Sequence, residues 1–172
     1  MTGALSARDA SGRRMKPILA AAASALAIAG LGALTTNIGP WYYRLRKPTW
    51  QPPDWLFGPA WTLIFALAAL AGVLYWHRES SRDSRLLTLS MFALNGFLNT
   101  LWSLLFFRFE RPDWALYEVG FLWLSIALLI VLLGRTSSTA ASLLVPYLAW
   151  VSFASLLNWK IVELNAPFTS GG

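Results

Sequence analysis

The chain has 172 residues, of which 56% are apolar and only 13% are charged. An average soluble domain has roughly 45–50% apolar and about 25% charged residues, so this composition indicates a protein of the lipid bilayer. The sequence contains no cysteine and one histidine, which excludes disulfides, thiolate chemistry and a multi-histidine metal site. The net charge of +6 does not indicate nucleic-acid binding, because the basic residues are spread over the tail and the loops.

Five apolar runs are long enough to form membrane-spanning helices, since a span needs about 20 mostly apolar residues. They cover residues 17–38, 56–76, 86–107, 114–133 and 142–164. Three of the connections between them are short, so we expect helices that are neighbours in sequence to pack antiparallel. The chain is therefore predicted to be an all-α membrane protein, a bundle of five transmembrane helices.

The two ends of the chain are predicted to be tails. Residues 1–16 are polar and rich in small side chains, and we expect them to be disordered. The basic residues before the first apolar run also resemble a cleaved secretory signal, but the run exceeds the usual length of about 7–15 residues, which favours a retained helix. We assign the five-helix domain to residues 17–166 and a C-terminal tail to residues 167–172. Small side chains recur in the first span at a spacing that lets another helix approach closely, namely Ala21, Ala25, Ala29 and Ala33.

The connection between the first two spans is aromatic, basic and stiff at once. Residues 41–55 read WYYRLRKPTWQPPDW, and each proline fixes φ at about −65° and disfavours a helix. We expect this first loop to act as a lid on a pocket, with Trp50 reaching into it. Such a lid suits a flat, apolar, anionic ligand. Membrane topology or lipid phosphates nevertheless explain the basic residues slightly better than ligand contact does, namely Arg44, Arg46 and Lys47.

Aromatic, polar and small side chains recur on one face of each later span, and we expect these stripes to face a shared pocket. The stripes of the second and third spans are Trp61, Phe65 and Gly72, and Asn95, Asn99, Trp102 and Phe106. Those of the fourth and fifth spans are Trp114, Glu118, Phe121 and Ser125, and Pro146, Trp150, Ala154 and Asn158. Ala154 is small between two larger neighbours, which leaves room for a ligand.

Several stripe residues have a purely structural alternative. Asn95 and Asn99 are costly in lipid unless they are paired, and we favour hydrogen bonds between helices over ligand contact for them. Trp61 and Trp150 lie too deep to be explained by anchoring at the membrane interface, which favours a role in the pocket. Glu118 needs a partner inside the membrane, either a loop arginine or a ligand.

The order of these residues along the chain resembles the TspO/MBR family of tryptophan-rich sensory and translocator proteins. The resemblance covers nearly the whole chain and leaves out only residues 1–16. The matching segments are Trp41-Tyr42, Leu45-x-Lys47-Pro48-x-Trp50-x-Pro52-Pro53-x-Trp55, Pro59-x-Trp61-Thr62, Leu98-Asn99-x-x-Trp102-Ser103, Phe106-Phe107, Trp114-Ala115-Leu116, Pro146-Tyr147-Leu148-Ala149-Trp150 and Leu157-Asn158.

The resemblance implies a five-helix transmembrane bundle, commonly a homodimer, with a pocket closed by the first loop. Family members bind tetrapyrroles such as protoporphyrin IX and haem, and isoquinoline or benzodiazepine drugs; no cofactor or metal is expected. The host membrane is then the cell membrane of a bacterium or the outer mitochondrial membrane of a eukaryote. The implied ligand-binding residues are Trp50, Trp61, Phe65, Asn99, Trp102, Trp114, Glu118, Trp150, Phe153, Ala154 and Leu157.

The resulting hypothesis is an integral membrane receptor or sensor for protoporphyrin IX or haem, with porphyrin transport or regulation as related roles. The alternative is an enzyme that degrades protoporphyrin IX oxidatively in light, with Trp61 and Trp150 as catalytic residues. No acid–base pair, nucleophile or metal cluster in the sequence supports that chemistry, so we favour a protein that is not an enzyme. Sterol binding is not expected, because Trp159 stands where the family's sterol motif has tyrosine.

Overall fold

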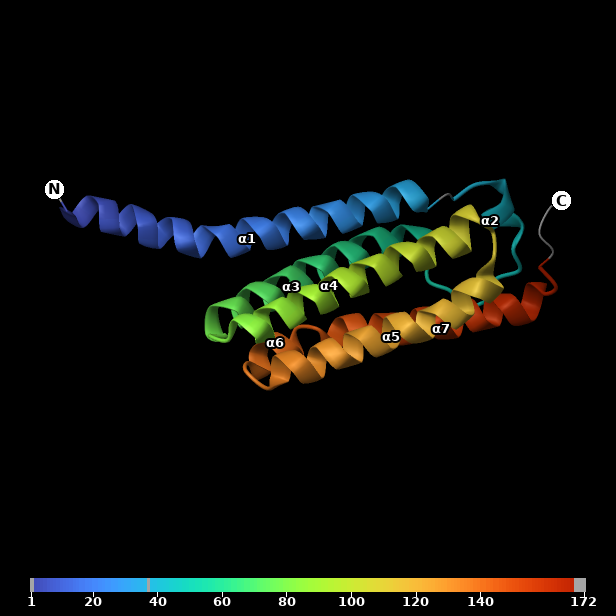
Figure 1. Ribbon diagram of the computed structural model, residues 1–172. Coiled ribbons are helices and arrows are strands. Elements are labelled where there is room, and N and C mark those ends of the chain that lie inside the picture. The colour runs from blue at the N-terminus through green and yellow to red at the C-terminus, as the bar shows by residue number, and fades with distance from the viewer. Residues whose placement is uncertain (1, 37, 169–172) are drawn as a thin grey trace.

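Five long helices run along a common axis, and the two chain termini lie at opposite ends of the bundle (Figure 1). The computed structural model describes residues 2–36 and 38–168, and none of these lies in a β-strand. The long helices are α1 (Thr2–Thr35), α3 (Phe57–Arg78), α4 (Arg82–Ser103), α5 (Pro112–Gly134) and α7 (Val145–Asn165). The short helices α2 (Pro40–Arg44) and α6 (Ser138–Ser142) lie in the connections before α3 and before α7.

Five segments of the described chain are long and apolar enough to cross a membrane, which confirms the predicted fold class. The predicted apolar runs differ from these segments by no more than four residues at either end. At about 1.5 Å per residue, a helix of the length of α5 measures about 35 Å, enough for a hydrocarbon core of about 30 Å. The segments are Pro17–Thr35, Asp54–Arg78, Arg82–Arg108, Pro112–Gly134 and Ser138–Asn165.

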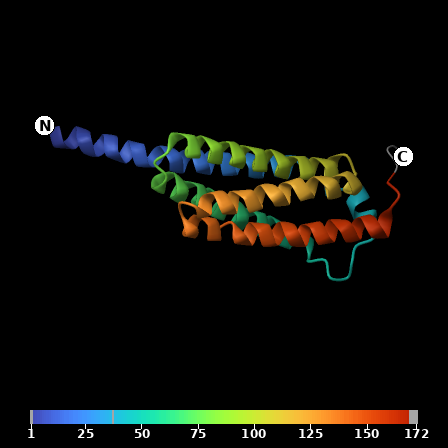
Figure 2. The ribbon, with the colours of Figure 1, turned by 60° about the horizontal axis from the view of Figure 1, so that its bottom comes forward.

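The helical backbone of α1 begins at Thr2, where the sequence predicted a disordered tail over residues 1–16. Extending an existing helix adds one hydrogen bond for each residue that is ordered, and the alanines, leucine and arginines here favour helix, which explains the difference. Figure 2 shows this part of α1 projecting beyond the other helices. Of the predicted C-terminal tail, residues 169–172 lie outside the described residues.

The long helices form a ring in the order α1, α3, α7, α5, α4. Helix α1 packs on α3 and α4, helix α5 packs on α4 and α7, and a short contact between α3 and α7 completes the ring. The predicted packing of sequence neighbours is confirmed for α4 with α5 and for α5 with α7. Helix α4 packs mainly on α5 and α1 rather than on its other neighbour α3. This arrangement leaves space between α1, α3, α4 and α7.

The two ends of the bundle differ in their connections. We call the end that carries the first loop, residues 45–56, the loop end, and the end that carries residues 79–81 and 135–137 the far end. Buried apolar residues form a cluster at the far end, namely Ala71, Tyr75, Leu129, Leu133, Ala140, Ala141 and Leu144. Further clusters lie in the middle (Ile64, Val119, Leu122, Ile126, Tyr147 and Val151) and at the loop end (Tyr42, Phe106, Ala115, Leu157 and Ile161).

One side chain of α7 holds the first loop in place. The Asn165 side-chain oxygen accepts a hydrogen bond from the Arg46 N–H (2.8 Å), and its amide nitrogen donates to the Arg46 carbonyl oxygen (2.8 Å). The loop then enters α3 through a 3₁₀ turn, Asp54–Leu56. The pair of bonds ties the backbone of the loop to the end of α7, which positions the rest of the loop across the loop end.

Candidate functional site

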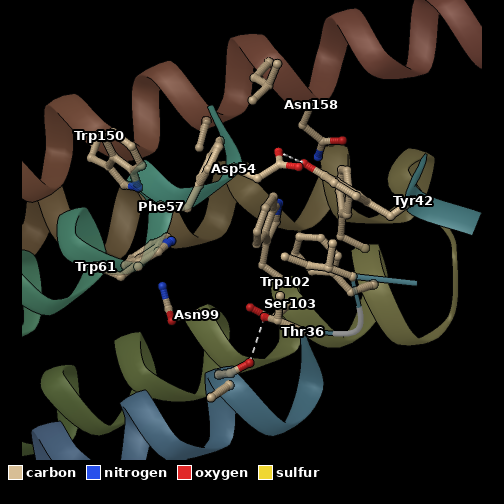
Figure 3. A pocket seen from close by; sticks show the side chains of 18 of the residues that line it. Thr36, Tyr42, Asp54, Phe57, Trp61, Asn99, Trp102, Ser103, Trp150 and Asn158 are labelled. Atoms are coloured by element: carbon tan, nitrogen blue, oxygen red, sulfur yellow. Dashed lines mark hydrogen bonds between the residues drawn. The ribbon is translucent and has the colours of Figure 1, made fainter. Parts of the chain in front are cut away.

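A cavity of about 370 Å³ lies inside the loop end of the bundle. Its volume falls in the range of about 300–1,000 Å³ that is usual for small-molecule sites. Helices α1, α3, α4 and α7 and the first loop all contribute to its walls (Figure 3). The residues of α3, α4 and α7 that line it, together with the turn that follows α4, are Phe57, Gly58, Trp61, Thr62, Phe65, Asn99, Trp102, Ser103, Phe106, Phe107, Trp150, Ala154, Leu157, Asn158 and Ile161.

Aromatic rings form much of the cavity wall. Trp61 and Phe65 are four residues apart on α3, so their rings lie one above the other, stacked at 5.4 Å between centroids. Trp102 and Phe106 have the same spacing and stack at 5.2 Å. Trp150 from α7 and Trp61 meet edge to face, with 6.5 Å between their ring centroids. Three tryptophans from three helices thus surround one space, as Figure 3 shows.

A turn of π-helix, Leu104–Arg108, follows α4 at the loop end. In this turn the Phe109 N–H donates to the Leu104 carbonyl oxygen five residues earlier, at 2.9 Å. Such turns occur often at functional sites because they change the direction of the side chains that follow. Here Phe106 and Phe107 both line the cavity, and Phe107 also packs on the Tyr42 ring at 5.8 Å.

Two asparagines on one face of α4 have different surroundings. Asn95 is buried, donates to the Ser125 hydroxyl (2.8 Å) and accepts from the Tyr147 hydroxyl (3.2 Å). It therefore links α4 to α5 and α7, as the structural alternative predicted. Asn99 donates to the same Tyr147 hydroxyl (3.3 Å) and also lines the cavity. Asn99 is held by the helix-to-helix network and is also available to a ligand.

The cavity wall holds buried polar atoms that have no hydrogen-bond partner among the described residues. These atoms are the indole nitrogens of Trp102 and Trp150 and the side-chain oxygen of Gln51. A buried donor or acceptor without a partner costs about 1–3 kcal/mol. The two indoles offer N–H donors and Gln51 offers an acceptor, so a ligand with complementary groups gains specificity as well as affinity in this cavity.

Helix α2 and the first loop together form a polar cluster at the cavity edge. The Tyr42 hydroxyl donates to the Asp54 carboxylate (2.8 Å), and burial together with that carboxylate raises the pKa of Tyr42 well above its ordinary value. The Lys47 ammonium lies 3.4 Å from the centroid of the Tyr42 ring. Burial lowers the pKa of Lys47, and the negative charge of Asp54 opposes this effect. Because its pKa is raised, the Tyr42 hydroxyl stays protonated at neutral pH and remains a donor.

Most of the residues predicted for the site line the cavity. They are Trp61, Phe65, Asn99, Trp102, Trp150, Ala154 and Leu157. Contrary to the prediction, Trp50 does not reach into the cavity. The hydrogen bonds between Arg46 and Asn165 set the path of the loop, and Trp50 stays 49% exposed. Its ring meets Phe153 edge to face. Phe153 itself does not line the cavity, and its ring packs on Trp150 with 5.7 Å between the ring centroids.

Two predicted residues of α5 also lie away from the cavity lining. Trp114 is 51% exposed and its ring lies under the Arg111 guanidinium at 4.2 Å. Glu118 is 6% exposed, and neither of its carboxylate oxygens has a hydrogen-bond partner within the described chain. Of the two alternatives for Glu118, a loop arginine or a ligand, the first is not realised with Arg111, which pairs with Asp113 two residues away.

Several cavity residues were not among the predicted site residues. Helix α1 supplies the small residues Ala29, Gly32 and Ala33, and Thr36 follows directly after it. Helix α2 supplies Tyr42, and the first loop supplies Gln51 and Asp54. The alanine spacing of the first span indicated close helix approach but not a cavity wall. Asn158 was placed on the α7 stripe, and it also bridges to α5: its amide donates to the Pro112 carbonyl (3.0 Å) and accepts from the Leu116 N–H (3.1 Å).

The fold and the cavity define a multi-pass membrane protein with five helices and an aromatic internal site. The model of the TspO/MBR family matches residues 18–164, and the chain belongs to this family. The tryptophan-rich protein TspO of Chlorobaculum tepidum is 43% identical over 136 residues, which are 76% of this chain and 84% of that protein. The protein of the same name from Archaeoglobus fulgidus is 39% identical over 151 residues, 87% and 97% of the two chains. The human translocator protein is 30% identical over 132 residues, 76% and 78% of the two chains.

Proposed function

We propose that this chain is an integral membrane receptor that binds a flat conjugated ligand, a tetrapyrrole such as protoporphyrin IX or haem, in the loop-end cavity. The observation that carries the proposal is the set of three tryptophans around one cavity, Trp61, Trp102 and Trp150. Two of them, Trp102 and Trp150, bury an indole N–H that has no partner among the described residues. Aromatic faces stack on a conjugated macrocycle, and each indole N–H can donate to a ligand acceptor.

Family membership supports the same proposal. Relatives carry the names tryptophan-rich sensory protein and translocator protein, and a receptor that binds a small molecule is compatible with both names. Isoquinoline and benzodiazepine-type compounds are also flat and aromatic, and the proposal places them in the same cavity. We also propose that the receptor forms a homodimer and that it lies in a cell membrane or an organelle membrane.

A fluorescence titration tests the proposal. The full chain in uncharged detergent micelles is titrated with protoporphyrin IX, and quenching of tryptophan emission at micromolar ligand is expected. Ala154→Phe places a large ring inside the cavity and is expected to abolish quenching. Ala149→Phe is the matched control, because Ala149 is exposed on another face of the same helix. Absence of quenching in the wild type, or equal quenching in both variants, contradicts the proposal.

A second candidate function is light-dependent oxidation of bound protoporphyrin IX, with dioxygen as the electron acceptor. The observation that favours it is the edge contact of Trp61 with Trp150 beside the cavity, at 6.5 Å between ring centroids. Illumination of the complex is then expected to bleach the Soret band in the wild type and not in Trp61→Phe or Trp150→Phe. A stable Soret band in the light, or bleaching that persists in both variants, removes this candidate.

A further inference from the structure

The charge at the edge of the cavity is opposite to the charge expected from the basic loop. Among the described residues that line the cavity, Asp54 alone carries a charged side chain. Arg44 ends α2, Arg46 and Lys47 belong to the first loop, and none of them lines the cavity. The Lys47 ammonium lies instead against the Tyr42 ring.

Asp54 is the centre of a small network in which the donors are already used. One of its oxygens, Oδ1, accepts from the Tyr42 hydroxyl (2.8 Å) and from the Gln51 amide nitrogen (3.1 Å). The same Gln51 nitrogen also approaches the Tyr42 hydroxyl oxygen at 3.3 Å. Figure 3 shows Asp54 beside Trp102 and Asn158, with its bond to Tyr42 dashed.

Two acceptor atoms of this network are left for a ligand. The second carboxylate oxygen of Asp54, Oδ2, accepts no hydrogen bond from any described residue. The Gln51 side-chain oxygen is buried and also has no hydrogen-bond partner among the described residues. The Tyr42 hydroxyl, held as a donor to Asp54, cannot serve as a donor to a ligand at the same time. The loop side of the cavity is therefore an acceptor site in which the Asp54 carboxylate faces the ligand, while the Lys47 ammonium lies on the Tyr42 ring and does not line the cavity.

We infer that this acceptor site takes a protonated amine of the ligand and disfavours a ligand carboxylate. The inference rests on the proposed function of the cavity and names the group that the ligand carries at its loop-facing edge. An ammonium gains charge-assisted hydrogen bonds to Asp54 and Gln51, whereas a carboxylate meets the like charge of Asp54. A tetrapyrrole with two propionates must therefore bind with them directed away from Asp54.

Two probes of the same shape and opposite charge test this inference. The first is protoporphyrin IX, and the second is its bis(2-aminoethyl)amide, which carries two ammonium groups in place of the two carboxylates. Both are titrated against the full chain in uncharged micelles, with tryptophan quenching as the signal. We expect the wild type to bind the diamine at least about tenfold more tightly, since hydrogen bonds to charged groups are stronger than those between neutral groups.

Variants assign the preference to the acceptor site. Asp54→Asn keeps the size of the side chain and is expected to reduce the preference for the diamine by about tenfold. Gln51→Leu removes the second acceptor and is expected to reduce it by a smaller factor. Asp83→Asn is the matched control, because Asp83 lies in the first turn of α4 at the far end. The preference of this variant for the diamine should equal that of the wild type. Melting temperatures of all variants check that they are folded.

The outcomes separate this inference from the proposed function. If both probes bind and their ratio is the same in the wild type and Asp54→Asn, the inference is wrong and the proposed function stands. If the diamine binds and protoporphyrin IX does not, the inference holds and a dicarboxylate tetrapyrrole is excluded as the ligand. If neither probe quenches tryptophan emission, both proposals fail.

Discussion

At the far end, polar groups of both connections meet at one carboxylate, whereas at the loop end polar atoms of the cavity wall have no partner among the described residues. At the far end the Glu79 carboxylate accepts from the Thr136 hydroxyl (2.8 Å), the Ser81 N–H (2.8 Å) and the Tyr75 hydroxyl (3.2 Å). At the loop end the indole nitrogens of Trp102 and Trp150 are buried without a partner among the described residues.

The same small residue type has opposite roles at the two ends. Ala71 of α3 is completely buried in the far-end cluster, packed among its apolar side chains. Ala154 of α7 lines the cavity, where its small side chain leaves space. A densely packed end stabilises the bundle and a loosely packed end accommodates a ligand, so stability and binding are expected to respond to different substitutions.

The largest expected difference comes from placing phenylalanine at the two alanines. Ala71→Phe forces extra volume into a filled core, which costs about 1–3 kcal/mol and lowers the melting temperature. Ala154→Phe fills existing space and should leave the melting temperature close to that of the wild type. Thermal unfolding in micelles measures both. An equal loss of stability in the two variants contradicts the packing difference between the ends.

The two asparagines of α4 separate stability from binding on a smaller scale. Asn95→Ala removes two buried hydrogen bonds, to Ser125 and Tyr147, and is expected to cost about 1 kcal/mol, since such bonds in membranes average about 0.6 kcal/mol each. Its affinity for protoporphyrin IX should not change. Asn99→Ala, one helical turn nearer the loop end, should instead weaken binding. Unfolding and fluorescence titration of both variants give the comparison, and a reversed pattern refutes it.

The smallest expected effect concerns the dependence of stability on pH at the far end. Hydrogen bonds from the Ser81 N–H and then from the Thr136 hydroxyl lower the pKa of Glu79 below its ordinary value of 4.5. A lowered pKa means that the stability contributed by Glu79 is present above about pH 4.5 and is lost as the pH falls further. Glu79→Gln should lower the melting temperature at neutral pH and reduce its decrease in acid. A melting temperature that falls equally in acid for both proteins contradicts this role.

The sequence was sufficient to predict the helices and much of the cavity. Apolar length predicts the five spans, and helical spacing predicts that Trp61, Phe65 and Trp102 share a site with Trp150, because regular helices fix the direction of each side chain. The composition of the first loop says less about the direction in which its side chains point. Proline limits the backbone of the loop, but its position depends on the bonds between Arg46 and Asn165, which are 119 positions apart.

This dependence explains which predicted residues lie outside the cavity. Trp50 was expected inside the cavity because it matches the family pattern. The loop, held by the bonds between Arg46 and Asn165, directs Gln51 and Asp54 to the cavity instead. The basic residues were more numerous and suggested a cationic lid, while the tertiary structure brings only the carboxylate of Asp54 to the lining. Glu118 is buried as its position in the span requires, but its partner cannot be inferred from spacing.

Hydrogen–deuterium exchange of the full chain with and without protoporphyrin IX tests most directly whether the loop end is the ligand site. Binding in the cavity is expected to protect residues 42–56 of α2 and the first loop, and the turn at 104–108 that follows α4. Residues 79–81 and 135–137 at the far end should exchange at an unchanged rate. Protection at the far end, or none in the loop although ligand is bound, contradicts the assignment of the site.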